Sequence, residues 1–324
     1  RYAAGVVPVA SLLALVTCAA AETCKLEIKQ LDSTITRSSS GKMPVESWFR
    51  STRSQSFFEQ TGGRAGMIRG RDRPGIPEFS KVIKKEPSEY NAEHVFRGVA
   101  ELGSQYFGFA LDTSREDKEA QEGGKKKGQA KTESKNPVMA AVEANQTGVA
   151  LAYDRLYCDL NHNGDLTDDK VIEAQEAPRR SKSYAHCSFP LVDLTIEVDG
   201  KKMKYAFRMR VYSRAASRYS YANASLSAAA YREGEITVDG KTYRAAVVDF
   251  NSNGRFDDRF SIREQRSSPD EPVYPQYGDM LYLIDEEAER PPGPVSPYDP
   301  STNPSLHYVT QLVNLDGNFF NLDI

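Results

Sequence analysis

The sequence is poor in the residues that most metal and redox enzymes use. Its 324 residues include four His, four Cys and one Trp. It has no C-x-x-C, H-E-x-x-H, G-x-S-x-G or G-x-x-x-x-G-K-[ST] pattern, so thioredoxin-like redox sites, zinc proteases, serine-hydrolase elbows and phosphate-binding loops are not indicated. The formal net charge of −3 lacks the basic excess that favours nucleic-acid binding, and we expect no nucleic acid partner.

Charge is also absent from the beginning of the chain. Residues 3–21 carry no charged side chain, and the stretch ends in three alanines before the polar Glu22. This pattern predicts a signal peptide over 1–21 that is cleaved after Ala21. A transmembrane anchor or a lipid on Cys18 would also fit. We therefore expect an exported protein that is periplasmic, at the cell surface or extracellular, with no transmembrane span in the mature chain.

Cleavage after Ala21 would leave three cysteines, Cys24, Cys158 and Cys187. Disulfides persist in the oxidising compartments that exported proteins reach. Because three is an odd number, one internal disulfide at most can form, and Cys158 with Cys187 is the pair we expect. Two unrelated buried thiols are the alternative.

A basic segment follows the signal. Residues 37–85 contain eleven basic and four acidic side chains and are rich in Ser, Gly and Pro. Such a composition disfavours a packed core, which predicts a basic flexible linker over 22–90. Its cations and interleaved aromatics, Trp48, Phe49, Phe57 and Phe58, would suit an anionic surface such as lipid head groups or acidic polysaccharide. A plain solvated tether explains the same residues.

From residue 91 to 324 the patterns are those of a β-rich domain, with a charged, mobile insertion at 114–135. Asp-Gly pairs at 199–200, 239–240 and 316–317 lie between apolar runs, which predicts three hairpins. Residues 95–100 and 106–111 form a fourth candidate. One short helix is expected at 138–144. The fold class is therefore all-β, with antiparallel hairpins in a sandwich or partly open barrel, few short helices and a possible internal duplication.

Two copies of D-x-N-x-N-G begin at Asp159 and Asp249, and each ends in an Asp pair. Alternating oxygens before a Gly resemble the first half of an EF-hand calcium loop. Position 12, however, is Lys170 or Phe260 rather than Glu. We expect weak Ca²⁺ binding, on the order of 10⁻⁴ to 10⁻³ M, and more readily at Asp159. Turns held by hydrogen bonds without metal are the alternative. The candidate ligands are Asp159, Asn161, Asn163, Asp165, Asp168, Asp169, Asp249, Asn251, Asn253, Asp257 and Asp258.

These patterns carry a resemblance. The run from Phe96 to Asp112, with RLYCDLNHNGDLTDDKVIEA and GEITVDGKTYRAAVVDFNSNGRFDD, resembles uncharacterised exported proteins of planctomycete-type bacteria. The resemblance extends from about Val95 to the end of the chain. It implies export and a β-rich fold, and it implies no catalytic activity.

The sequence assigns no catalytic residues. Asp112-Thr113-Ser114 looks like half of an aspartic peptidase site, but no second D-T-G or D-S-G is present. Tyrosines such as Tyr212 and Tyr221 could stack on sugars, although aromatic residues on strands more often fill a core. We therefore expect a non-enzymatic, calcium-stabilised binding module of the cell envelope or extracellular space. An exported hydrolase of polysaccharide or peptide, with unassigned carboxylates, is the alternative.

Overall fold

The computed structural model describes residues 23–31, 45–63, 75–114, 150–181, 183–215, 219–262, 275–285, 287, 302–310, 312–315 and 317–324. Two helical turns occur there, the 3-10 helix η1 (Val45–Trp48) and α1 (Phe79–Val82). The predicted signal peptide (1–21), the helix (138–144) and nearly all of the insertion (114–135) lie outside the described residues. No helix in the described ranges has the length and apolar character that a membrane crossing requires.

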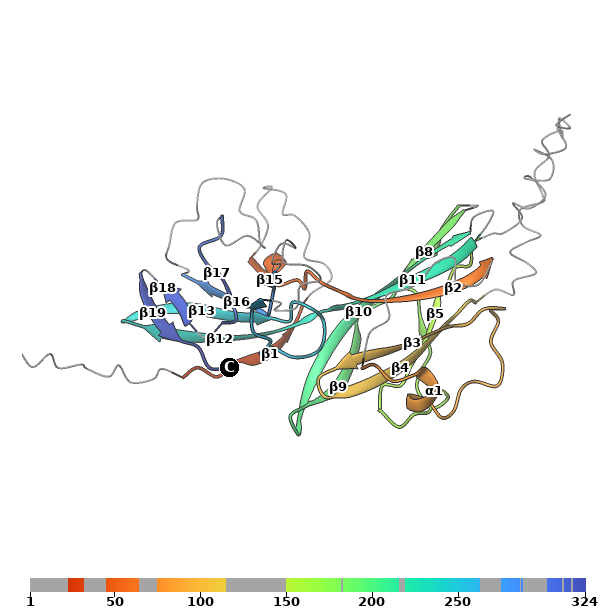
Figure 1. Ribbon diagram of the computed structural model, residues 1–324, viewed down its shortest axis with the longest axis horizontal. Helices are drawn as coiled ribbons and strands as arrows, with labels where there is room; N and C mark the ends of the chain where they lie inside the picture. The colour runs from red at the N-terminus through yellow and green to blue at the C-terminus, as the bar shows by residue number, and fades with distance from the viewer. Residues whose placement is uncertain are drawn as a thin grey trace, which may run out of the picture.

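Strands make up most of the described chain, and they form three main sheets (Figure 1). The six-stranded sheet contains β2 (Gln55–Gly63), β11 (Tyr219–Ala228), β10 (Lys201–Ala215), β8 (Tyr184–Ser188) and β7 (Arg179–Arg180), with β9 (Val192–Val198) also paired to β10. The four-stranded sheet contains β3 (Phe96–Leu102), β4 (Gln105–Asp112), β5 (Arg155–Cys158) and β6 (Ile172–Glu173). The five-stranded sheet contains β1 (Glu27–Gln30), β12 (Ala230–Val238), β13 (Lys241–Val248), β16 (Met280–Ile284) and β17 (Leu306–Tyr308).

Two small hairpins complete the described strands: β14 (Ser261–Ile262) with β15 (Pro275–Gln276), and β18 (Leu312–Leu315) with β19 (Asn318–Asn321). Every strand pair in the described ranges is antiparallel. The all-β antiparallel prediction is confirmed. The sheets are open and not closed into a barrel, which is consistent with a β-sandwich.

The four predicted hairpins all form. β9–β10 and β12–β13 turn at Asp199-Gly200 and Asp239-Gly240, and both residues of each pair have positive φ, between 50° and 79°. This is the conformation that a type I′ turn needs, and Asp and Gly reach it at low cost. β3–β4 and β18–β19 form the other two hairpins.

The largest buried cluster lies between the six-stranded and four-stranded sheets and continues onto the five-stranded sheet through Tyr243, Val247 and Leu281. In Figure 1 the first two sheets are at one end of the molecule and the five-stranded sheet is at the other. Phe57 of β2 meets Phe109 of β4 edge to face, with ring centroids 4.9 Å apart. A second cluster lies on the five-stranded sheet. There the ring centroid of Phe49 is 4.8 Å from that of Tyr231 and 5.4 Å from that of Tyr282.

The prediction of a flexible linker over 22–90 is wrong for the described parts of that range. β1 pairs with β12, β2 pairs with β11, and Phe49, Phe57 and Ile83 are buried. Apolar side chains at these few positions anchor the segment, and cations of the segment such as Lys81 and Lys85 are paired with Glu78 and Asp165. Net charge over a window therefore does not determine burial, which depends on individual side chains.

The expected disulfide is also absent from the structure. Cys158 and Cys187 are both buried free thiols, and Cys24 is a free thiol too. Cys158 lies on β5 in the main core, whereas Cys187 lies on β8 in a separate alanine-rich cluster. Burial raises the pKa of both thiols, so each is held as a neutral thiol.

We predict that Phe57→Ala destabilises the protein by about 3 to 5 kcal/mol, because it empties a core site of a large ring. The neighbouring Phe58 points to the opposite side of the same strand, and Phe58→Ala is the matched control with a much smaller effect. Urea unfolding of both variants measures the difference. Equally small losses would mean that β2 is not part of the core.

Candidate metal-binding loops

Each D-x-N-x-N-G loop begins directly after a strand of a main sheet. The loop beginning at Asp159 (loop 1) joins β5 to β6, and the loop beginning at Asp249 (loop 2) follows β13 and precedes β14. The first Asp follows the last residue of a buried strand in both cases. Its carboxylate is therefore carried into the protein, and Asp159 and Asp249 are 1% and 0% exposed.

The two loops fold around the first carboxylate in the same way. Asp159 accepts backbone N–H groups from Asn163 at 2.9 Å and Gly164 at 3.0 Å. Asp249 accepts them from Asn253 at 3.2 Å and Gly254 at 2.7 Å. The glycine is at φ 80° in both loops, a conformation that residues with a Cβ rarely adopt.

The two asparagines of each loop also repeat their contacts. The side-chain oxygens of Asn161 and Asn163 accept the N–H groups of Asn163 and Asp165 at 3.1 and 2.8 Å. Both side-chain amides then donate to one carboxylate oxygen of Asp168, at 3.3 and 2.6 Å. In loop 2, Asn251 and Asn253 donate in the same manner to Asp258, both at 2.7 Å.

The structure thus brings four predicted ligands together in each loop: Asp159, Asn161, Asn163 and Asp168 in loop 1, and Asp249, Asn251, Asn253 and Asp258 in loop 2. The other three are placed differently. Asp165 pairs with Lys85 at 2.7 Å, Asp257 pairs with Arg255, and Asp169 accepts the N–H of Leu160.

Loop 1 concentrates negative charge. Burial raises the pKa of Asp169, and the nearby carboxylates of Asp168 and Asp159 raise it further. Lys85 and Thr167 hydrogen bonds instead lower the pKa of Asp165 to about 2. The ammonium of Lys85 therefore balances Asp165, while Asp159 and Asp168 are close enough to Asp169 to repel its charge.

The carboxylate oxygens of loop 2 have different hydrogen-bond and ion-pair partners from those of loop 1. Asp249 also accepts the Tyr205 hydroxyl at 2.7 Å, and Arg255 bridges Asp257 and Asp199. A further buried carboxylate, Asp279, accepts the N–H groups of Phe250 and Asp258, both at 2.9 Å. Burial raises the pKa of both Asp249 and Asp279, and the proximity of Asp249 raises that of Asp279 further.

Asp279 is the residue of this region that the sequence analysis did not assign. It lies just before β16, thirty positions after Asp249 in the chain, and only the pairing of β13 with β16 brings it to loop 2. In the sequence, the run Asp279-Met280-Leu281-Tyr282 is similar to Asp154-Arg155-Leu156-Tyr157 before loop 1. This similarity indicates a second apolar strand but not the contact of Asp279 with loop 2.

The oxygen donors of loop 1 fit a hard cation better than those of loop 2. Each oxygen that accepts one N–H keeps a second lone pair, and Ca²⁺ takes carboxylate, amide and backbone oxygens. In loop 2 the first carboxylate already accepts three donors. The described residues contain no group of three or more His, Cys, Asp or Glu side chains arranged around a metal, so a cation in loop 1 would depend on Asn161 and Asn163 as well.

Asp112 and Ser114, which resemble half of an aspartic peptidase site, make local hydrogen bonds in the structure. Asp112 is buried at the end of β4, where it accepts the N–H groups of Asn91 and Ala92. Asp154 accepts both the N–H and the hydroxyl of Ser114. His162 lies against the ring of Phe107, with centroids 5.1 Å apart.

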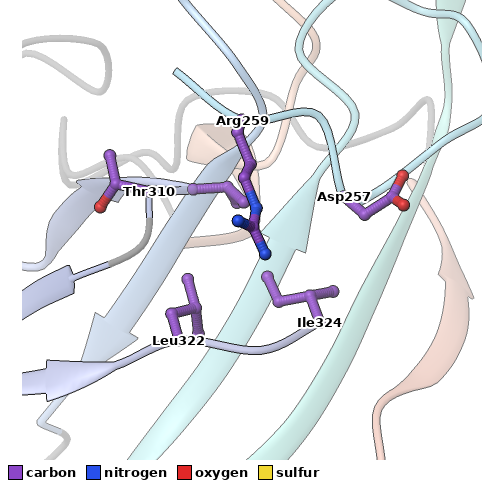
Figure 2. Close-up of a pocket in the computed structure, with 6 residues that line it drawn as sticks. Asp257, Arg259, Thr310, Leu322 and Ile324 are labelled. Carbon is purple, nitrogen blue, oxygen red and sulfur yellow. The ribbon is translucent and has the colours of Figure 1, made fainter. Parts of the chain in front are cut away.

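A small pocket of about 60 Å³ lies beside the β18–β19 hairpin, where Arg259 reaches towards Leu322 and Ile324 (Figure 2). The carboxylate of Asp257 turns away from Arg259 in this view. The volume suits a few water molecules and is far below the several hundred Å³ of a typical ligand site.

Comparison with family models, curated proteins and solved structures finds no match for this chain.

We predict that stability falls as the pH rises from acid towards about 9, with Asp279 as a main cause. Its pKa is raised to about 9 in the folded protein, so the folded state holds a proton that the unfolded chain has already released. The stabilisation is complete below the ordinary carboxyl pKa and is lost as the pH rises through the folded one.

Asp279→Asn tests this by urea unfolding across that range. The variant loses one hydrogen-bond acceptor, which lowers the free energy of unfolding by about 1 to 3 kcal/mol at acid pH. The difference in unfolding free energy between the variant and the unmodified protein should become smaller towards pH 9. Parallel curves for the two proteins would show that Asp279 does not hold the proton.

Proposed function

We propose that this protein is an exported, non-enzymatic β-rich binding module whose loop 1 binds Ca²⁺ weakly and stabilises the fold. The observation that carries the proposal is the convergence of Asp159, Asn161, Asn163 and Asp168 within one loop. Loop 2 is a second copy of the same turn, closed by hydrogen bonds from Tyr205 and to Asp279.

Electrostatics supports a cation in loop 1. Three carboxylates lie close together, those of Asp159, Asp168 and Asp169, and the ion pair of Lys85 is with Asp165. Like charges at short range are unfavourable in a partly buried loop. A divalent cation among the oxygens would remove that repulsion.

Calcium in loop 1 would stabilise more than the loop itself. The carbonyl oxygen of Gly164 accepts the N–H groups of Lys84 and Lys85, and Leu166 donates back to Lys85. Asp159 donates its own N–H to Gly108 on β4. A bound cation would therefore hold the segment after α1 against the four-stranded sheet.

Export rests on the apolar residues 3–21 and the alanines before Glu22, and on the resemblance to exported planctomycete-type proteins. The absence of assigned catalytic groups favours a binding role over the hydrolase alternative, because the buried carboxylates Asp112 and Asp154 act as acceptors for nearby backbone N–H groups.

Thermal unfolding of the full chain with Ca²⁺, with Mg²⁺ and with chelator tests the calcium proposal. At about 10 mM Ca²⁺ and the affinity expected for such a site, binding stabilises by about 1.4 to 2.7 kcal/mol. For a protein of this size that corresponds to a rise in Tm of roughly 3 to 10 °C. No calcium-selective rise would overturn the proposal.

Asp168→Asn and Asp258→Asn are a matched pair, because each removes the carboxylate that accepts both asparagine amides of its loop. We predict that Asp168→Asn abolishes the calcium-dependent rise in Tm, whereas Asp258→Asn retains it. Loss of the rise in Asp258→Asn alone would assign the metal to loop 2.

A further inference from the structure

The outer face of the six-stranded sheet carries a stripe of aromatic rings. Side chains alternate between the two faces of a strand, and those opposite the buried ones point to solvent. Phe58, Tyr221, Tyr212 and Tyr184 follow one another across β2, β11, β10 and β8. Their successive ring centroids are 5.5, 6.4 and 6.4 Å apart.

These rings do not fill the core. Tyr184 and Tyr212 are 44% and 37% exposed, while their strand neighbours Ala185 and Val211 are buried on the other face. Phe58 and Tyr221 are partly exposed. A row of exposed and partly exposed rings across four strands indicates an interaction surface.

The stripe lies in a cationic setting. Arg210 and Arg214 are exposed on β10 on either side of Tyr212. A single acidic residue, Glu59, occurs in β2, β8, β11 and the part of β10 from Arg208 onward. Glu59 is opposite the buried Ala222 and faces the other side of the sheet. The outer face of these strands is therefore positive although the whole chain is acidic.

Neutral hydrogen-bonding groups lie beside the stripe. Asn223 is paired with Phe58 and Tyr212 in the strand register, and Ser225 is paired with Arg210. All are partly exposed or exposed. Rings, guanidinium groups, an amide and a hydroxyl thus share one flat surface.

We propose that this outer face binds an anionic polysaccharide. Sugar rings would stack on the aromatic stripe, and carboxylate groups would pair with Arg210 and Arg214, whose planar guanidinium groups match a carboxylate in geometry. The amide and hydroxyl would bond the sugar hydroxyls. A single-stranded nucleic acid also uses aromatic stacking, but the chain has a net charge of −3 and lacks the basic excess that is typical of nucleic-acid binding.

This inference does not depend on calcium in loop 1, so binding is measured in chelator. Isothermal titration of the full chain with polygalacturonate is compared with dextran sulfate, neutral dextran and oligo-dT. We expect salt-sensitive binding to polygalacturonate and none to neutral dextran. Equal binding of dextran sulfate would support the anionic class and show that the face does not distinguish sulfate from carboxylate.

Tyr212→Ala and Arg210→Gln should each weaken binding roughly tenfold. The controls Tyr277→Ala and Arg259→Gln remove an exposed ring and an exposed cation away from this face and should change affinity less than about twofold. Circular dichroism checks that each variant is folded.

Three results would overturn the proposal. The first is no binding to either anionic polysaccharide, or binding of neutral dextran with equal affinity. The second is an equal loss in the control variants. The third is tighter binding of oligo-dT with the same sensitivity to Tyr212→Ala and Arg210→Gln, which would make the face a platform for single-stranded nucleic acid.

Discussion

The packing of the six-stranded sheet against the four-stranded sheet is the interaction on which the rest of the structure depends. Phe57 and Phe109 meet at its centre, and Gly98 leaves room for the Phe109 ring, since a Cβ there would come within 2.3 Å of it. Burial of apolar surface is the main force that holds such layers together. Because β2 supplies Phe57, the basic N-terminal region is tied to the core.

This packing also places the two loops. The β3–β4 hairpin contacts both of them: Gly108 accepts the N–H of Asp159 in loop 1, and Gly103 donates its N–H to Asn253 in loop 2. The first loop then reaches outward to Lys84 and Lys85, while the second is enclosed by Tyr205 and Asp279. One local shape is therefore held in two different electrostatic environments.

That difference separates the chemistry of the loops. In loop 1 the buried carboxylate of Asp159 lies close to those of Asp168 and Asp169, and their mutual repulsion favours a cation. In loop 2 the carboxylates are buried among neutral donors, which favours a retained proton. The six-stranded sheet also has a buried and a solvent-exposed side. Its inner face packs in the core, and its outer face carries exposed arginines and tyrosines.

The local sequence by itself determined the hairpins and the shape of both loops. An Asp-Gly turn depends on φ angles of two residues, and each D-x-N-x-N-G loop is closed by bonds among about ten consecutive residues. These contacts need no distant partner. The all-β class followed from them, as did the grouping of Asp159, Asn161, Asn163 and Asp168.

The tertiary structure decided everything that depends on a distant partner. It placed Phe57 in the core despite the charge around it, kept Cys158 and Cys187 in separate clusters, and brought Asp279 to loop 2. It also determined that Tyr205 and Tyr231 are buried, whereas Tyr184 and Tyr212 are exposed. Alternation along a strand separates two faces, but only the packing of one sheet on another determines which face water reaches.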